Sequence, residues 1–293
     1  MILNSISMKL IRVLSLVAFF IAYFPVSGQE RVVNSDDIAI VERILKDFKE
    51  ADKSDPGKLL KDVALTFLET PYVAHTLETG PDEKMVINLR ELDCTTYAEN
   101  CLALVHTILS DQPSFDTFSR ELERIRYRDG VRSGYISRLH YFSEWIDNNV
   151  RKGYVIDVAR SIKAPELTTK VGFMGDHPAS YPVLKSHPEL VPQLKSYEGK
   201  VSDTKRWYIP IADFDKYEQS FHDGDIIGIA TSVKGLDVTH VVIVSREKQR
   251  LSFIHASSAA EKVVLDPLTL KEYLSKGKSN TGIMVVRPVR LHP

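Results

Sequence analysis

The chain contains only two cysteines, and one of them is at a position that favours a nucleophilic thiolate. Cys94 follows Asp93 in the stretch ELDCTTYAEN, at the predicted first turn of a helix over residues 94–109. The dipole and the free N–H groups of a helix N-terminus favour a thiolate, the nucleophilic form of cysteine. Cys101 lies on the apolar stripe of the same helix, about 10 Å further along, which is too far for a disulfide. We therefore predict that Cys94 is a free, reactive thiol and that Cys101 is a packing residue.

Two histidines are each the polar member of an otherwise apolar row on a predicted strand. The rows are Val238, His240, Val242 and Val244 in VTHVVIVS, and Leu251, Phe253 and His255 in LSFIHAS. The polar segment REKQR between them has the length of a hairpin connection. A hairpin symmetric about Glu247 and Lys248 would place His240 directly opposite His255, with Cβ atoms about 4.5–5.5 Å apart. A slip of one residue would turn the two rings to opposite faces of the sheet.

One thiol and two imidazoles allow two kinds of site. In the first, His240 takes the proton of the Cys94 thiol, and His255 orients His240 as the third member of a triad does. In the second, the same three side chains bind zinc. The chain contains neither HExxH nor CxxC, so the sequence favours the nucleophile and predicts no metal or other cofactor. For either histidine alone, a packed and hydrogen-bonded residue is the competing interpretation.

The predicted elements change from helices to strands along the chain. Apolar periodicity predicts helices over residues 35–50, 55–70, 94–109, 114–126 and 137–149. A strand is predicted over residues 154–162, and residues 163–200 are rich in Pro, His, Gly and Ser. After residue 205 come six short strand-like runs, interrupted by one helix over residues 267–275. This order is typical of an α+β fold, with N-terminal helices packed on a C-terminal antiparallel β-sheet.

The N-terminus has the order of a secretory signal peptide. Basic Lys9 and Arg12 precede an apolar run over residues 14–24, and small residues follow at Ser27 and Gly28. We predict cleavage near Gly28–Gln29, leaving residues 29–293 as a single catalytic domain that is periplasmic or secreted. A net charge of −1 gives no reason to expect nucleic-acid binding. No later apolar run has the about 20 residues that a membrane span needs.

Five segments of the chain together resemble the NlpC-type papain-like cell-wall hydrolases. In order, they are PYVAHTLE, LDCTTYAEN, DGDIIGIA, VTHVVIV and FIHASS. The resemblance implies a papain-like fold in which Cys94 is the nucleophile, His240 the general base and His255 the residue that orients it. It also implies that Tyr72 lies beside the thiol, where its hydroxyl can contact the substrate. Compact members of the family have a shorter interval between nucleophile and base, so residues 110–205 are interpreted as an insertion that shapes the cleft.

Further segments are similar to one branch of that superfamily, the N-acetylmuramoyl-L-alanine amidase-like proteins. They are SGYISRLHYFSEWI, YIPIADFDKYEQSFHDGDIIGIAT and KGLDVTHVVIV. The similarity implies cleavage of the amide between muramic acid and L-Ala in peptidoglycan or muropeptides. Three alternatives stay open: an endopeptidase that cuts between D-Glu and the diamino acid, a muropeptide-binding protein without activity, and a glycosidase with two carboxylates. Arg138 is a further candidate for substrate binding, through a sugar hydroxyl or a stem carboxylate. Ser257, just past His255, is a candidate residue of the cleft wall, with a strand end as the competing interpretation.

Overall fold

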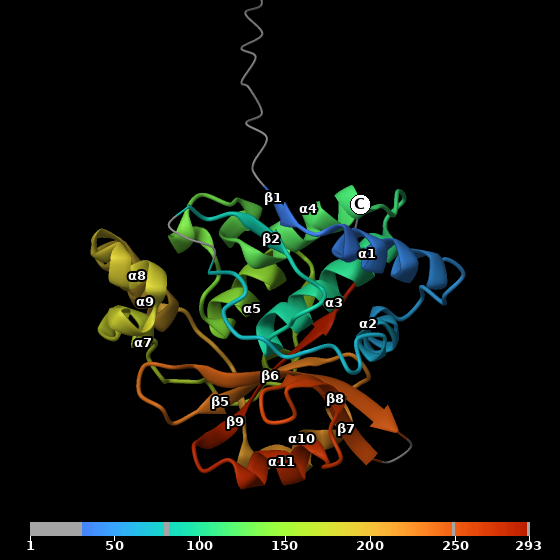
Figure 1. Cartoon of the computed structure of the whole chain (residues 1–293). Helices are drawn as coiled ribbons and strands as arrows, with labels where there is room; N and C mark the ends of the chain where they lie inside the picture. The colour runs from blue at the N-terminus through green and yellow to red at the C-terminus, as the bar shows by residue number, and fades with distance from the viewer. Residues whose placement is uncertain (1–30, 79–81, 248–249, 292–293) are drawn as a thin grey trace, which may run out of the picture.

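The computed structural model describes residues 31–78, 82–247 and 250–291, so the predicted signal peptide lies outside the described residues (Figure 1). Its centre is a seven-stranded sheet in the order β3-β9-β5-β6-β7-β8, with β4 also paired to β9. All neighbouring strands of this sheet are antiparallel. The strands are β3 Val155–Asp157, β4 Ile209–Pro210, β5 Ile226–Thr231, β6 Val238–Glu247, β7 Arg250–Ser257, β8 Lys262–Leu265 and β9 Asn280–Pro288. A separate parallel pair joins β1 Arg31–Val33 to β2 Met85–Ile87.

Helices cover both faces of the large sheet. The larger layer, at the top of Figure 1, consists of α1 Ser35–Asp47, α2 Pro56–Leu65, α3 Cys94–Leu109, α4 Phe115–Arg126 and α5 Phe142–Arg151. Its apolar side chains share one buried cluster with Val241, Ile243 and Ile254 of the sheet. On the other face, α11 Leu270–Lys276 and α10 Phe214–Tyr217 pack with Val242, Val244 and Phe253. The predicted mixed α+β architecture, with helices on an antiparallel sheet, is confirmed.

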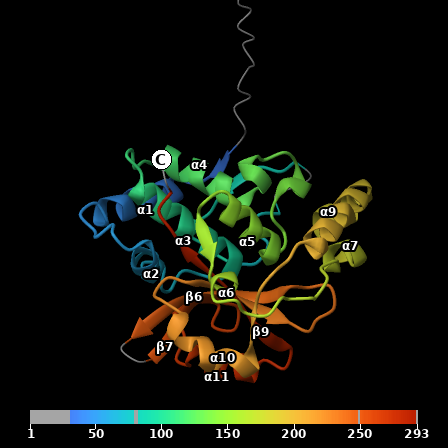
Figure 2. The ribbon, with the colours of Figure 1, turned by 180° about the vertical axis from the view of Figure 1, so that it is seen from behind.

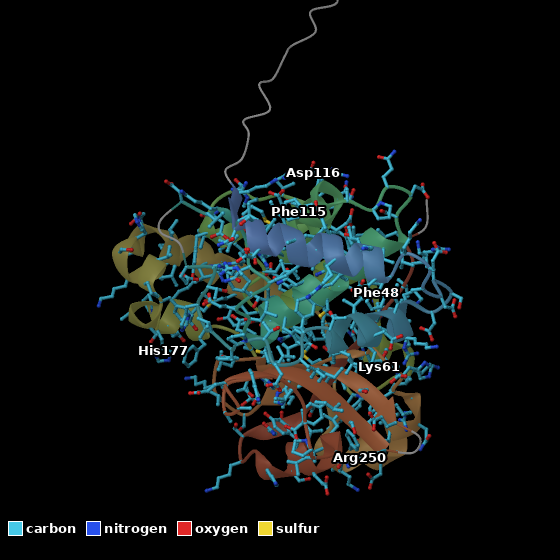
Figure 3. All side chains as sticks on the ribbon, turned by 45° about the vertical axis from the view of Figure 1, so that its right-hand side comes forward. Phe48, Lys61, Phe115, Asp116, His177 and Arg250 are labelled. Atoms are coloured by element: carbon cyan, nitrogen blue, oxygen red, sulfur yellow. The ribbon has the colours of Figure 1, made fainter. Side chains whose placement is uncertain are left out.

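A small helical lobe lies at one side of the molecule (Figure 2). It contains α7 Phe173–Asp176, α8 Pro182–Ser186 and α9 Val191–Asp203, which pack in a buried cluster of their own. The hydroxyl of Tyr141 donates to Glu198 at 2.7 Å and accepts from the backbone N–H of Met174 at 3.0 Å, so it ties the lobe to the main body. Figure 3 shows His177 on this lobe and Arg250 at the sheet end of the molecule.

Several predicted elements have different boundaries in the structure; the helix expected over residues 55–70, for example, ends at Leu65. The strand expected over residues 154–162 ends at Asp157, and the short helix α6 Val158–Ser161 follows. The side chain of Asp157 accepts from the backbone N–H of Arg160 and so caps this helix. The helix expected over residues 137–149 begins only at Phe142. Its first turn is held by Asp237, whose carboxylate accepts from the Ser143 N–H at 2.7 Å, a partner 94 residues away.

Candidate active site

Cys94 is the first residue of α3, as the sequence predicted. The carboxylate of Asp93 accepts from the backbone N–H groups of Thr95 and Thr96 at 3.0 and 2.7 Å, and the Thr96 hydroxyl accepts from the N–H of Asp93. This reciprocal cap fixes the start of the helix and therefore the direction of the thiol. Cys94 is half-buried and Cys101 fully buried, and both are free thiols.

The sulfur of Cys94 lies against the start of strand β6, beyond the region where β6 pairs with β7. The described residue pairs between β6 and β7 end at Ile243 and Ile254, so the first residues of β6 are not paired with β7. There the backbone N–H of Val241 donates a hydrogen bond to the Cys94 sulfur. Val241 directly follows His240 in the chain, so this contact brings Cys94 close to the backbone next to His240.

Two tyrosines lie within electrostatic range of the same sulfur. Burial raises the pKa of Tyr72, and the negative charge of a Cys94 thiolate raises it further. Burial also raises the pKa of Tyr273 in α11, with smaller contributions from Asp266 and then from Cys94. Tyr72, predicted to contact the substrate, is thus in electrostatic range of the thiol but is not among the residues that line the cavity shared by Cys94 and His240. Sequence reasoning did not identify Tyr273.

The predicted hairpin register is wrong by two residues, yet the two histidines meet. Glu247 pairs with Arg250, so each residue of β6 faces a residue two positions further along β7 than expected. A shift of two leaves every side chain on its face, because the period of a strand is two. His240 Nε2 therefore lies 2.6 Å from His255 Nδ1, with the rings nearly perpendicular.

The apolar row of β6 is interrupted before His240. His240 pairs with Ile229 and Val238 pairs with Ala230, so Thr239 is an extra residue in a β-bulge. Val238 consequently packs on the α3 side, whereas Val242 and Val244 belong to the cluster on the other face. The predicted row is correct only from His240 onward.

A third group, which sequence reasoning missed, continues the histidine pair. His255 Nε2 lies 3.2 Å from Oδ2 of Asp266, the residue that follows β8. A carboxylate only accepts hydrogen bonds, so His255 carries its proton on Nε2 and presents Nδ1 as an acceptor. His240 then donates through Nε2, and its Nδ1 keeps the lone pair that a general base needs. The only sequence signal for Asp266 was a carboxylate placed directly after a strand that borders His255.

Burial sets the protonation of the site. It raises the pKa of the Cys94 thiol to about 11, and the negative charge of Asp93 adds to that rise. Burial also lowers the pKa of His240 to about 3, with a further contribution from His255. The pKa of His255 is lowered by burial, while Asp266 opposes the change. Both shifts favour a neutral thiol and a neutral imidazole at neutral pH, because desolvation opposes the thiolate that the helix dipole favours.

Cys94 and His240 line one cavity of about 270 Å³. Arg138, another predicted substrate-binding residue, also lines it. It is only 6% exposed and forms ion pairs with Glu78 at 2.6 Å and Glu83 at 3.6 Å, so its charge is already matched. Ser257 is not among the lining residues. Its hydroxyl accepts from the backbone N–H of Ala260 at 3.2 Å, in the turn after β7.

His240 also borders a second hollow, of about 500 Å³. Residues of α11 and its flanking segments line that hollow, among them Asp266, Tyr273, Lys276 and Asn280. The general-base candidate thus stands between two spaces, one shared with Cys94 and one with Asp266. A substrate whose scissile bond lies at His240 can place one part in each of these two spaces.

Metal-binding geometry is not found in the described part of the chain. There, no group of three or more His, Cys, Asp and Glu side chains is arranged to hold a metal ion. Both ring nitrogens of His255 already have protein partners, which disfavours the zinc interpretation. Among the described residues, no helix is long and apolar enough to cross a membrane.

Comparison with known proteins decides the family. A family model described as N-acetylmuramoyl-L-alanine amidase-like matches residues 62–283. The chain belongs to this family. By family it is an amidase-like cell-wall hydrolase, and membership implies a substrate from peptidoglycan. No curated protein shows a significant match.

An amidase is among the solved structures that resemble this chain. An N-acetylmuramoyl-L-alanine amidase from Bacteroides uniformis is 38% identical, covers 80% of this chain and 99% of its own, and superimposes with a TM-score of 0.77. A protein from Bacteroides fragilis described as a candidate xylanase is 41% identical over 77% of this chain and 99% of its own, with a TM-score of 0.70. A Legionella pneumophila protein, 22% identical over 89% of this chain and 98% of its own, shares the fold with a TM-score of 0.64.

Proposed function

We propose that this chain is an exported, papain-like cysteine amidase that hydrolyses the N-acetylmuramoyl–L-alanine amide of peptidoglycan or muropeptides. The observation that supports this most is the arrangement of Asp266, His255 and His240 in one hydrogen-bonded series, beside the cavity that His240 shares with Cys94. The predicted signal peptide over residues 1–28 would place the enzyme in the periplasm or outside the cell. Residues 110–205, proposed as the insertion, contribute Tyr135, Arg138 and Trp145 to the cavity wall.

The proposed reaction has two steps. The sulfur of Cys94 bonds to the amide carbon while its proton passes to Nδ1 of His240, and the backbone N–H of Cys94 stabilises the oxyanion. His240 then gives that proton to the departing nitrogen as the C–N bond breaks, which leaves a thioester. Water, deprotonated by His240, attacks the thioester and restores the thiol. A neutral thiol and a neutral imidazole are the required starting forms, because His240 must be free to accept the first proton.

Product analysis tests the bond that is cleaved. We expect purified enzyme to convert a muramoyl peptide into free sugar acid and a peptide that begins with L-Ala, as read by mass spectrometry. Release of a sugar that still carries L-Ala and D-Glu would instead identify the stem endopeptidase. Full substrate recovery after long incubation, with saturable binding, would support a binding protein and contradict the proposal.

A glycosidase is the competing class, because one structural relative is described as a candidate xylanase. Hydrolysis of a sugar bond requires two available carboxylates facing the bond. Each acid that lines the cavity already has a protein partner for at least one of its carboxylate oxygens. Glu99 pairs with Arg126, Glu78 pairs with Arg138, Asp93 caps α3, and Asp237 caps α5. The cavity therefore favours the cysteine chemistry.

The tautomer argument predicts the effect of Asp266→Asn. Oδ1 of Asp266 accepts from the Leu268 N–H at 2.8 Å, so an asparagine would keep its oxygen there and turn its NH₂ toward His255. His255 would then accept at Nε2 and donate from Nδ1, which forces the His240 proton onto the nitrogen that should act as base. We expect kcat/KM to fall by about 10- to 100-fold.

The control for this prediction is Asp215→Asn, which removes an exposed carboxylate paired with Lys271 at 2.7 Å. That variant should keep wild-type kcat/KM and wild-type circular dichroism. Equal activity of the Asp266→Asn and wild-type enzymes would show that Asp266 does not set the His255 tautomer.

A further inference from the structure

Four rings pack together around the histidine pair. The ring centroid of Tyr273 in α11 lies 5.7 Å from that of His255 and 6.3 Å from that of His240. Phe253, two residues before His255 on β7, lies 5.0 Å from both Tyr273 and His255. The planes of Tyr273 and His255 meet at 78°, an edge-to-face arrangement that aromatic pairs favour. Tyr273 therefore contacts both imidazoles of the pair, from the side that α11 covers.

The position of the Tyr273 ring is fixed by α11. Leu270 and Leu274 of this helix are buried in the apolar cluster on its face of the sheet, and Tyr273 packs against the same cluster (Figure 1). The N–H of Tyr273 donates to the carbonyl of Thr269, the N-cap, at 3.0 Å. Asp266 precedes the same helix, so one short segment supplies both the carboxylate and the ring that the histidines contact.

The His240 side chain has little other support. Thr239 forms a β-bulge before it, and the described pairs between β6 and β7 end at Ile243. The backbone of His240 is therefore paired only with Ile229 of β5. Within the described part of the chain, its ring makes one hydrogen bond, from Nε2 to His255. A single hydrogen bond does not fix the plane of a ring, because the ring can turn about that contact.

The hollow of about 500 Å³ gives the His240 ring room to turn. Both His240 and Tyr273 line it. With the Tyr273 ring present, that side of the imidazole is in contact with another ring. Without it, the imidazole would be free to swing into the hollow, and Nδ1 would turn away from the cavity that His240 shares with Cys94. A general base acts only when its lone pair is directed at the proton that it accepts.

We propose that Tyr273 is a positioning residue, whose ring holds the His240 imidazole in its hydrogen bond with His255 and with Nδ1 directed toward Cys94. The inference deepens the proposed function and rests on it. The contacts that carry it are made by the ring, so it assigns no role to the tyrosine hydroxyl. Tyr273 is then a third support of the base, beside His255 and Asp266.

Two variants, Tyr273→Ala and Tyr273→Phe, test the inference with a muramoyl dipeptide as substrate. We expect Tyr273→Ala to lower kcat by about 10- to 100-fold with a smaller change in KM, because the base is misplaced after the substrate has bound. Tyr273→Phe keeps the ring and should recover most of the activity that Tyr273→Ala loses. The matched control is Tyr217→Ala, because Tyr217 in α10 is half-buried against the same apolar cluster but lines neither the cavity nor the hollow. This control should lose stability in thermal melting and keep kcat.

The proton between the two histidines gives a measurement that does not depend on catalysis. Nuclear magnetic resonance of enzyme with isotope-labelled imidazole nitrogens detects a hydrogen-bonded ring N–H, and loss of the signal in His240→Ala assigns it to His240. We expect the signal in wild type, Tyr273→Phe and Tyr217→Ala. It should be absent from Tyr273→Ala at the same pH and temperature, because a ring that turns into the hollow exchanges this proton with water.

The outcomes separate this inference from the proposed function. If Tyr273→Ala retains both kcat and the N–H signal, Tyr273 does not position His240. If Tyr273→Phe loses as much kcat as Tyr273→Ala, the hydroxyl rather than the ring is responsible, which also overturns the assignment. A rise in KM alone would overturn it as well, because the ring would then bind substrate in the hollow instead of positioning the base. If wild type cleaves no muramoyl dipeptide, the proposed amidase function fails, and the N–H signal still shows whether Tyr273 holds the histidine pair.

Discussion

Cys94→Ala is expected to lower kcat/KM for a muramoyl peptide on the order of 10⁴-fold or more, because no other group near His240 can form the thioester. The substitution removes one atom from a half-buried position, and the Asp93 cap that fixes the start of α3 is a contact of backbone N–H groups that alanine retains. The fold should therefore persist. Activity is measured with the muramoyl dipeptide, and folding by circular dichroism and thermal melting.

The chain supplies a matched control in Cys101→Ala. Cys101 lies two turns along the same helix and is fully buried in the apolar core. Its replacement should cost stability, of order 1 kcal/mol for the small cavity that it leaves, and should keep kcat/KM near wild type. Substantial turnover by Cys94→Ala, or a comparable loss of turnover in Cys101→Ala, would mean that the thiol at the helix start is not the nucleophile.

Local signals in the sequence were sufficient to predict where α3 begins. Asp93 and Thr96 form a cap within four residues, so the position of the thiol did not depend on distant parts of the chain. The two histidines were likewise predicted to share a face, because alternation along β6 and β7 is a local property. What alternation could not give was the hairpin centre, since a shift of two residues preserves every face.

The remaining parts of the site depend on contacts between distant residues. Asp266 meets His255 only because β8 pairs with β7, and the sequence contains no motif that joins the two. The cavity wall combines Glu78 with Arg138, 60 residues apart. The neutral resting state of Cys94 and His240 follows from burial, which a helix-dipole argument based on sequence alone does not include.

His240→Ala is expected to lower kcat/KM by about 10³-fold or more, because the thiol would then have no base and the leaving nitrogen no acid. His255 and Asp266 would remain in place but could not substitute, since they act on the substrate only through the His240 ring. His222→Ala, which changes an exposed histidine, is the control and should retain full activity. Retention of more than a tenth of wild-type activity in His240→Ala would argue that another group moves the proton.

The pH profile of the wild-type enzyme tests the protonation state of His240. His240 must be neutral to accept a proton, and burial lowers its pKa to about 3, so protonation does not remove the base until the pH is far below neutrality. We expect kcat/KM to stay level from about pH 8 down to about pH 5. If His240 had an ordinary pKa, the enzyme would lose half of its kcat/KM near pH 6.5. Circular dichroism at each pH separates loss of the base from loss of the fold. A loss of activity centred near pH 6.5 in folded enzyme would mean that His240 is solvated, and would favour a thiolate–imidazolium pair as the resting state.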